Sequence, residues 1–295
     1  MPSSPPVAEA GESGPGEGSP GERIAKRLAR AGICSRRDAE KLIAEGRVIV
    51  DGKKLASPAF NVRPGARITV DGKPVPEAEP SRLWRYNKPR GLLTTARDPQ
   101  GRPTVFQSLP PGLPRVVAIG RLDLNSEGLL LLTNDGALAR RLELPATGWV
   151  RRYRVRVHGT VEPKRLAALE NGVTIEGVAY GPIRAALDRQ KGDNAWLTMA
   201  LTEGKNREVR RVCEHLGWAV TRLIRIAYGP FQLGLLPAGA VEEVPGKVLR
   251  EQLGGKAPAK RRGGSRPAEA PAAGGRGGGH GDGRGGGHAH RRRPA

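Results

Sequence analysis

Cysteine, histidine and long apolar runs are scarce in this 295-residue chain, and each scarcity excludes a class of protein. Two cysteines, Cys34 and Cys213, are too few for a disulfide framework, so we expect both to be reduced and at least partly buried. The longest apolar run, around Leu129 to Leu132, is far shorter than the ~20 residues of a membrane-spanning helix. The N-terminus has neither the basic start nor the apolar segment of a signal peptide. We therefore expect a cytoplasmic protein with no membrane partner.

Acidic residues are few relative to basic ones. The chain has 50 Lys and Arg against 29 Asp and Glu, a formal net charge of +21 and a pI near 11.0. Such a charge attracts polyanions, nucleic acid first and an anionic membrane surface second. A surface that is merely well solvated mixes both signs nearly equally, so the composition favours nucleic acid.

The familiar catalytic signatures are also missing. The chain contains no GxxxxGK[ST] phosphate-binding loop, no GxSxG nucleophile elbow and no Cys–His cluster with zinc spacing. Before the C-terminal tail only His158 and His215 occur, and we interpret the three tail histidines as solvated spacers, so no metal site is expected. The candidates for chemistry therefore reduce to an acidic residue among arginines.

Composition divides the chain into two folded segments with flanking tails. Residues 1–21 are rich in Pro, Gly, Ser and Glu, and residues 251–295 are rich in Gly and Arg, so we expect both to be disordered. We interpret the basic tail as a flexible polycation that lies along the phosphates of a nucleic acid. Between the tails, a proline-rich linker over 76–82 separates a small domain over 22–75 from a larger one over 83–250.

The first folded segment has the pattern of two helices followed by hairpins. Apolar residues at helical spacing predict a helix over 24–31, ended by Gly32. Ser35 predicts the N-cap of a second helix, which runs to Gly46. Two later stretches, RVIVDGKK and ARITVDGKP, alternate apolar and polar residues into an Asp-Gly turn, which is typical of a tight hairpin.

Basic side chains accompany both predicted helices, and we expect them to form one RNA-facing surface. They are Arg23, Lys26, Arg27, Arg30, Arg36, Arg37, Lys41 and Arg47. The order and pattern of ERIAKRLARAGICSRRDAEKLIAEGRVIVDGK resembles the S4 RNA-binding domain, which implies RNA binding. Two alternatives are a helical module whose charges only solvate it and a helix-turn-helix DNA regulator, although no dimerising segment is apparent.

The second folded segment predicts an α+β fold. Predicted strands cover 115–120, 128–134, 152–159 and 196–201, and predicted helices cover 137–144, 163–172 and 207–217. Because these do not alternate as repeated βαβ units, we expect a mixed, largely antiparallel sheet. We expect the four tryptophans to be core residues rather than base-stacking platforms; they are Trp84, Trp149, Trp196 and Trp218.

The stretch VVAIGRLDLNSEGLLLLTNDG places Asp123 at an exposed bend between two apolar strands. Rigid support of this kind suits a catalytic carboxylate, which must be held within a fraction of an ångström. An aspartate in a bend can also serve only to stabilise the turn. The pattern by itself leaves both interpretations open.

Four motifs in order resemble those of the ribosomal RNA pseudouridine synthases that carry an S4 domain. They are YNKPRG at 86–91, GRLDLNSEGLLLLTNDG at 120–136, RYRV at 152–155 and GKNREVRR at 204–211. Together with the S4-like segment, the resemblance covers residues 22 to about 249. It implies an enzyme that converts a uridine to pseudouridine without a cofactor.

The resemblance also implies residue roles. Asp123 would be the carboxylate that attacks the sugar or starts loss of the base. Arg210 would pair with Asp123 and keep it ionised, and Tyr153 would stack on the target base and help to remove its C5 proton. The alternatives are a surface ion pair for Arg210 and an ordinary strand residue for Tyr153. Four further residues are expected to contact the substrate or support the site: Arg121, Val209, Lys88 and Asn87.

The resemblance extends to the target. The stretches DPQGRPTVFQSLP and LTEGKNREVRRVCEHLGWAVTRLIRIAYGPFQLGLLPAG look most like the branch that modifies the large ribosomal subunit. That branch implies 23S rRNA, in a helix near the peptidyl transferase centre, as free RNA or in a pre-ribosomal particle. The alternatives are 16S rRNA, transfer RNA, or a non-catalytic RNA-binding assembly factor. We expect a monomer.

Overall fold

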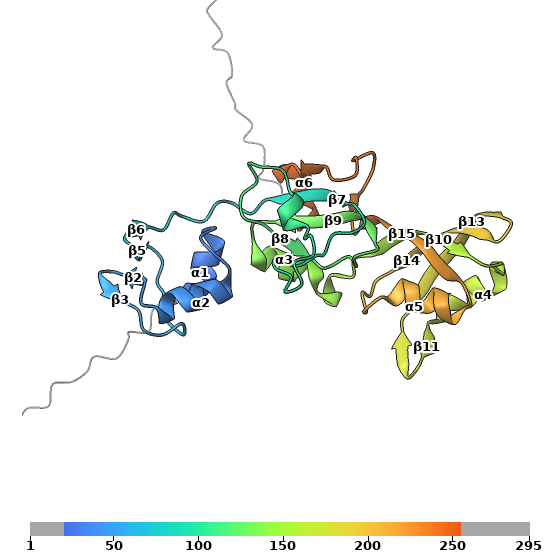
Figure 1. Cartoon of the computed structure of the whole chain (residues 1–295), viewed down its shortest axis with the longest axis horizontal. Helices are drawn as coiled ribbons and strands as arrows, with labels where there is room; N and C mark the ends of the chain where they lie inside the picture. The colour runs from blue at the N-terminus through green and yellow to red at the C-terminus, as the bar shows by residue number, and fades with distance from the viewer. Residues whose placement is uncertain (1–20, 255–295) are drawn as a thin grey trace, which may run out of the picture. The chain divides into compact units, whose positions relative to one another are not determined.

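The computed structural model describes residues 21–254 (Figure 1). The tails predicted to be disordered, 1–21 and 251–295, lie outside the described residues except for residue 21 and residues 251–254. The role predicted for the basic tail therefore also concerns residues outside the described part. Helix α6 (Gly246–Gln252) crosses the predicted end of the larger domain at residue 250, because Leu249 is buried in the core beside it. Residues 76–82, the predicted linker, contain neither helix nor strand.

Two helices begin the small N-terminal part, as predicted. Helix α1 (Ile24–Arg30) ends before Gly32, and helix α2 (Arg36–Ala44) begins after Ser35, whose hydroxyl accepts a hydrogen bond from the Asp38 amide at 3.1 Å. This bond satisfies one of the amides that a helix start leaves without a partner. The strands of this part are β1 (Glu22–Arg23), β2 (Val48–Val50), β3 (Lys53–Lys54), β4 (Asn61–Val62), β5 (Ile68–Val70) and β6 (Lys73–Pro74).

Both Asp-Gly turns form hairpins, which confirms the prediction. Asp51 and Gly52 connect β2 to β3 with φ of 49° and 80°, and Asp71 and Gly72 connect β5 to β6 with φ of 52° and 76°. Two successive residues with positive φ match the turn whose twist fits antiparallel strands. Strands β2 and β5 also pair, so the four form one small sheet that closes a separate core with the helices.

The larger part is built on a mixed sheet whose main strand order is β13-β14-β10-β15-β9-β7-β17. Among the strands described in residues 21–254, β15 and β9 are the one pair of this sheet that runs in parallel, so the sheet is largely antiparallel, as expected. Its strands are β7 (Leu83–Lys88), β8 (Val117–Ile119), β9 (Glu127–Thr133), β10 (Arg151–His158), β13 (Ile183–Lys191), β14 (Asn194–Leu201), β15 (Ala219–Tyr228), β16 (Phe231–Gln232) and β17 (Val241–Glu243). Strands β11 (Val173–Ile175) and β12 (Val178–Tyr180) form a separate hairpin.

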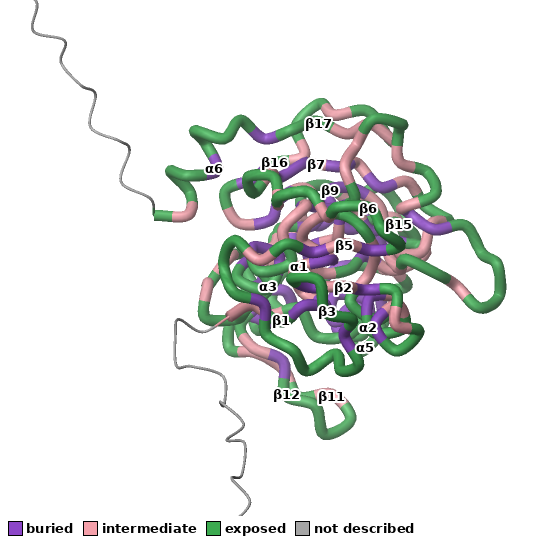
Figure 2. Tube along the Cα trace, turned by 90° about the vertical axis from the view of Figure 1, so that its left-hand side faces the viewer, coloured by how far each residue is buried: buried purple, intermediate pink, exposed green. Residues whose placement is uncertain are grey.

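Strand β9 is buried from its second residue, Gly128, to its end; Figure 2 colours the chain by burial. Leu130 and Leu132 join the core under helix α5 (Glu208–His215), whereas Leu129 and Leu131 join the core under α3 (Gly136–Glu143). Burial on both faces explains why this strand is a continuous apolar run rather than an alternating one. Helix α4 (Pro163–Ala168) contributes Leu166 to the same core as α5.

Gly128 permits the parallel pairing of β9 with β15. It has a φ of +97°, and a Cβ at this position would lie 2.4 Å from the Arg225 carbonyl oxygen. Any larger side chain would therefore clash with the backbone of the neighbouring strand. This contact joins the two halves of the sheet directly beside the bend that carries Asp123.

Candidate active site

Asp123 lies in the loop between β8 and β9, at the exposed bend that the sequence predicts. Its side chain is 37% exposed, while the flanking Leu122 and Ser126 are buried. The Asp123 carbonyl accepts a hydrogen bond from the Ser126 amide at 3.0 Å. The loop thus turns tightly and presents the carboxylate to solvent.

A buried lysine supports this loop from below. Lys88 ends strand β7 and is fully buried, and its ammonium group donates to the carbonyls of Pro89, Asp123 and Ser126 at 3.1, 3.1 and 2.9 Å. Burial lowers the Lys88 pKa to about 8, because desolvation disfavours the charged form. Lys88 therefore holds the loop that carries Asp123, and its part in a catalytic site stays a prediction.

The segment after Lys88 holds the same loop at two further points. The Thr94 hydroxyl donates to the Leu122 carbonyl at 2.8 Å, and the Gly91 amide donates to the Leu124 carbonyl at 2.9 Å. Successive carbonyls on both sides of Asp123 are therefore fixed by one short stretch of chain. This explains in physical terms why the YNKPRG motif accompanies the Asp123 motif.

A cavity of about 660 Å³ opens beside Asp123. Three of the predicted site residues, Arg121, Tyr153 and Val209, line it together with the aspartate. Arg121 is exposed at its rim, whereas Tyr153 is only 9% exposed and projects from strand β10. The cavity therefore brings together a carboxylate, an aromatic ring and an apolar wall.

The basic partner of Asp123 differs from the prediction. The cation within reach of its carboxylate is Arg207, with Nη1 4.0 Å from Oδ2, and no ion pair of Arg210 with Asp123 occurs in residues 21–254. Arg207 is the N-cap of α5 and has a φ of +52°, so its side chain does not follow the direction of the helix. The expected direct pair with Arg210 is therefore wrong for this conformation.

Arg210 instead supports the loop that carries Asp123. It is 7% exposed and donates to the Asn125 carbonyl at 3.0 Å and to the Val220 carbonyl at 3.4 Å. Its burial lowers the pKa, the neighbouring Arg207 lowers it further, and the charge of Asp123 opposes both effects. Arg210 therefore lies close enough to influence the carboxylate while its hydrogen bonds go to backbone.

Asn87 lies away from the cavity. Its side-chain amide donates to the Leu236 carbonyl at 2.7 Å, and its backbone exchanges hydrogen bonds with Gly239 and Ala240. Neither Asn87 nor Lys88 is among the described residues that line the cavity. The structure therefore places both as supports of neighbouring loops rather than at the cavity surface.

Two buried charged residues at the cavity escaped sequence reasoning. Arg225 is 2% exposed, and its Nε donates to the Leu129 carbonyl at 2.7 Å while Nη2 has no partner in the described residues. Glu208 is 4% exposed, burial raises its pKa, and its Oε1 likewise has no partner there. A signal for Arg225 exists, because the alternation of Leu223 and Ala227 places an arginine between them on the buried face.

The predicted RNA-binding residues do not all line one cavity. Four of them line a second cavity, of about 1010 Å³, together with Arg97 and Arg115 from the larger part of the chain. These four are Arg36, Arg37, Lys41 and Arg47. The other four, on β1 and α1, are not among the residues that line this cavity.

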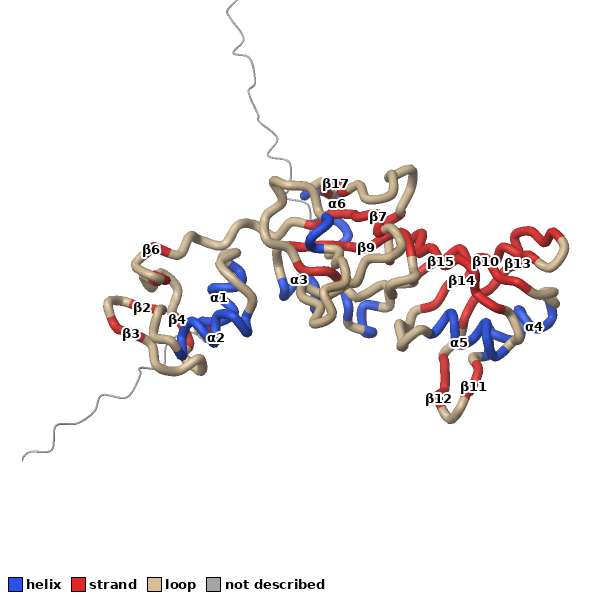
Figure 3. The backbone as a smooth tube through the Cα atoms, in the orientation of Figure 1, coloured by secondary structure: helices blue, strands red, loops and turns tan. Residues whose placement is uncertain are grey.

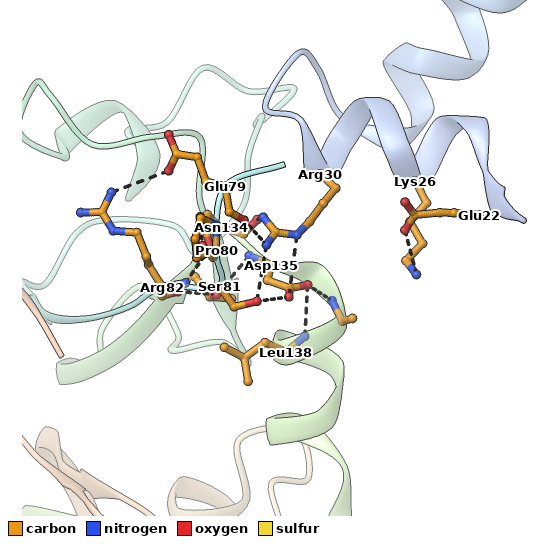
Figure 4. Close-up of polar contacts among 12 residues, drawn as sticks. Glu22, Lys26, Arg30, Glu79, Pro80, Ser81, Arg82, Asn134, Asp135 and Leu138 are labelled. Atoms are coloured by element: carbon orange, nitrogen blue, oxygen red, sulfur yellow. Dashed lines mark hydrogen bonds and ion pairs between the residues drawn. The ribbon is translucent and has the colours of Figure 1, made fainter. Parts of the chain in front are cut away.

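Arg30 in particular contacts protein (Figure 4). Its guanidinium lies 3.8 Å from the Asp135 carboxylate and donates to the carbonyls of Asn134 and Glu79. Asp135 is also the N-cap of α3, where it accepts from the Ala137 amide. Arg30 is therefore a contact between α1 and the larger part, and the prediction that it faces RNA is wrong for this conformation.

Two negative findings concern residues 21–254 alone. This part of the chain holds no group of three or more His, Cys, Asp or Glu side chains arranged to hold a metal ion. None of its helices has the length and apolar character needed to cross a membrane.

Comparison with known proteins identifies the class. A family model described as RNA pseudouridylate synthase matches residues 82–215, and the S4 domain model matches residues 22–68. An uncharacterized RNA pseudouridine synthase of Rickettsia felis is 50% identical over 230 residues, which cover 78% of this chain and all of that protein. The chain belongs to the RNA pseudouridine synthase family, whose members are isomerases, and it carries an S4 domain.

Individual relatives narrow the comparison. Ribosomal large subunit pseudouridine synthase B of Escherichia coli (strain K12) is 46% identical over 233 residues, covering 75% of this chain and 79% of that protein. Among solved structures, a crystal structure of a pseudouridylate synthase matches with a TM-score of 0.55 and 25% identity, covering 78% of this chain and 99% of the other. The fold and the order of the two domains therefore agree with the resemblance seen in the motifs.

Proposed function

We propose that the protein isomerises one uridine of 23S rRNA to pseudouridine, with Asp123 as the essential carboxylate and without a cofactor. The observation that carries the proposal is the position of Asp123, half-exposed at a cavity that also receives Tyr153 and arginine side chains. A uridine swung out of its helix needs such a pocket, because the bond to be broken is otherwise enclosed in stacked RNA.

The reaction exchanges one bond to the sugar for another. The C1′–N1 bond of uridine breaks, the uracil turns, and C5 bonds to C1′, while C5 loses a proton and N1 gains one. Asp123 acts as the ionised carboxylate, either by attacking C1′ or by starting loss of the base. Arg207 Nη1 lies 4.0 Å from Asp123 Oδ2, so its positive charge helps to hold the carboxylate in place.

The remaining cavity residues position the base and the RNA. Tyr153 stacks against the uracil and takes part in removal of the C5 proton, and Val209 forms an apolar wall. Arg121, exposed at the rim, holds a phosphate or fills the space that the extruded base leaves. Extrusion costs on the order of a few kcal/mol, which such contacts offset. Lys88 and Arg210 act indirectly by holding the Asp123 loop.

The second cavity supports RNA binding by the S4 part. Arg36, Arg37 and Lys41 are exposed around it, and Arg97 and Arg115 add positive charge from the larger part. Basic side chains on two parts of the chain that face one groove suit an RNA helix, whose shape is recognised through its phosphates. We infer that this groove binds the RNA flanking the target.

The choice of 23S rRNA rests on the 46% identity to ribosomal large subunit pseudouridine synthase B. A target in a helix near the peptidyl transferase centre, in free RNA or a precursor particle, follows from the same relation. The experiment that tests the proposal incubates the full chain as a monomer with 23S, 16S and transfer RNA transcripts and maps pseudouridine in each. We expect a single new site, in 23S rRNA.

Two variants separate catalysis from binding. Asp123→Asn keeps the size of the side chain but removes the charge, so modification should fall below detection while affinity for the RNA stays within about twofold of wild type. Modification confined to 16S rRNA or transfer RNA would overturn the proposed 23S rRNA target but not the proposed reaction. Binding without modification by the wild-type protein would favour a non-catalytic assembly factor.

A further inference from the structure

Four strands of the large sheet, β13, β14, β10 and β15, have helices packed against one of their faces. Helices α4 and α5 share a core with Val155 and Val157 of β10. Side chains of a strand alternate between its two faces, and in β10 every second residue is accordingly exposed. Figure 3 shows α4 and α5 on the same side of these strands. The exposed residues of β10 alternate with those that join the core with these helices, so they lie on the opposite side.

This exposed face is strongly basic. Its basic residues are Arg152, Arg154, Arg156, Arg184, Arg189, Lys191 and Arg222. Its acidic residues are Asp188 and Glu127. We refer to these residues, with Trp196, as the outer sheet face. Seven cations against two anions give it an excess of charge that a polyanion would neutralise.

The register sets Trp196 between arginines. Strand β14 pairs Trp196 with Arg189 on β13 and with Arg156 on β10, and β10 pairs Arg156 with Arg222 on β15. The guanidinium carbon of Arg154 lies 4.8 Å from the centre of the Trp196 ring. Trp196 is half-buried on this face, so the prediction that it belongs to the core is wrong.

Only part of the charge is neutralised within the protein. Arg222 forms an ion pair with Glu127 at 2.9 Å, and Arg154 lies 3.9 Å from Asp188. In the part of the chain that the structure describes, Arg152, Arg184, Arg189 and Lys191 form no ion pair within 4.0 Å. Ion pairs within the described residues therefore do not account for these four cations.

We propose that the outer sheet face binds a second, single-stranded segment of the RNA substrate, with phosphates along the arginines and a base stacked near Trp196. An open sheet that presents an aromatic ring among cations suits unpaired RNA, because splayed bases need a ring to stack on and the backbone needs positive charge. The face lies across the sheet from Tyr153 and hence from the catalytic cavity. The proposal rests on the RNA substrate of the proposed function and not on the identity of the target uridine.

The first test measures affinity for a twelve-nucleotide oligoadenylate, which contains no uridine to modify. In the full chain, Arg154→Gln, Arg156→Gln and Arg184→Gln are combined, since all three side chains are exposed. Each lost phosphate contact makes the slope of log affinity against log salt shallower by ~0.7 on single strands, so we expect a slope change of about 2. Because the electrostatic contribution vanishes near ~1 M salt, about one log unit away, affinity should be about a hundredfold weaker near ~0.1 M salt.

The matched control removes the same charge from elsewhere. Arg140→Gln, Lys247→Gln and Arg250→Gln alter three exposed cations on α3 and α6. This control should bind oligoadenylate within about twofold of wild type. Equal weakening of both triple variants would overturn the proposal, because only overall charge would then matter.

The second test concerns stacking. We expect Trp196→Ala to weaken oligoadenylate binding about tenfold, Trp196→Phe to restore most of it, and wild-type tryptophan fluorescence to be quenched on binding in a way that Trp196→Phe abolishes. Unchanged binding by Trp196→Ala would overturn the proposal. The proposal would also be overturned if the triple arginine variant and Trp196→Ala lost binding to polyglutamate but still bound oligoadenylate. That result would indicate an acidic protein as the partner. Pseudouridine formation by the wild type on 23S rRNA is scored separately, so its failure cannot be mistaken for failure of this face.

Discussion

Replacing Lys88 with methionine would test whether a buried ammonium group holds the catalytic loop. The side chain is fully buried, and its three hydrogen bonds all go to carbonyls in or beside that loop. Methionine matches the length of the lysine stem and fills the same space, but it has no proton to donate. The variant therefore removes the hydrogen bonds with little change in packing.

The expected magnitude follows from counting the carbonyls that lose a donor. Those of Pro89 and Ser126 have no other donor within residues 21–254, and each orphaned group costs about 1–3 kcal/mol. The Asp123 carbonyl keeps its bond from the Ser126 amide. Burial lowers the Lys88 pKa because the buried ammonium group is desolvated. The variant removes this desolvation cost, which offsets part of the lost stability. We expect a net loss of about 3 kcal/mol in the free energy of unfolding, which lowers Tm by about 8 °C.

The same change should slow catalysis. A shift of about 1 Å in a catalytic group can cost about a hundredfold in rate, so Lys88→Met should reduce the single-turnover rate of pseudouridine formation by one to two orders of magnitude. Chemical denaturation and a timed assay on 23S rRNA measure the two effects. Lys164→Met, exposed on α4, is the control and should change neither by more than about 0.5 kcal/mol. A Lys88→Met protein with wild-type stability and rate would refute the support role.

Three further predictions follow from single contacts. Between pH 8 and 10.5 the folded protein has released the Lys88 proton that the unfolded chain still binds, so wild-type stability relative to Lys88→Met should rise with pH, by up to about 1.4 kcal/mol per unit, in paired denaturation curves. Gly128→Ala should cost about 3 kcal/mol or more and lower the yield of folded protein, since its Cβ would overlap the Arg225 carbonyl; circular dichroism melts measure this. Ser35→Ala should lose about 1 kcal/mol with the helix cap, and NMR titration should show the lowered pKa of Asp38 moving up toward its ordinary value, because the Ser35 hydroxyl is the main cause of that shift. An unchanged Asp38 titration would contradict the last of these.

Local features were predictable because their causes are local. An Asp-Gly pair adopts positive φ cheaply in any context, so both hairpins of the small part follow from the residues themselves. Ser35 and Asp38 are three residues apart, which fixes the cap before any tertiary contact forms. The Asp123 bend was likewise visible, because apolar strands flank a short polar loop.

Strand β15 shows where sequence reasoning stopped. Arg222 and Arg225 interrupt its apolar pattern, and only the fold shows that one lies on the outer sheet face while the other is buried against the Leu129 carbonyl. Its parallel pairing with β9 joins residues about a hundred positions apart, and Gly128 makes room for it. Such pairing depends on contacts that no local pattern encodes. For Trp196 the alternation of Leu197 and Met199 already indicated the outer face, and the size of the ring misled the prediction.

By itself, the sequence determined the class of the protein, the order of its two domains and the aspartate on which its chemistry is proposed to depend, because each is written in contiguous motifs. Tertiary structure alone decided that Arg207 rather than Arg210 approaches Asp123, since the first residue has left-handed backbone at the helix start and the second is turned toward the Asn125 carbonyl. It also decided that Arg30 binds Asp135. The direction of a long charged side chain is set by which partners the folded backbone brings within about 4 Å, and that distance does not exist until the chain has folded.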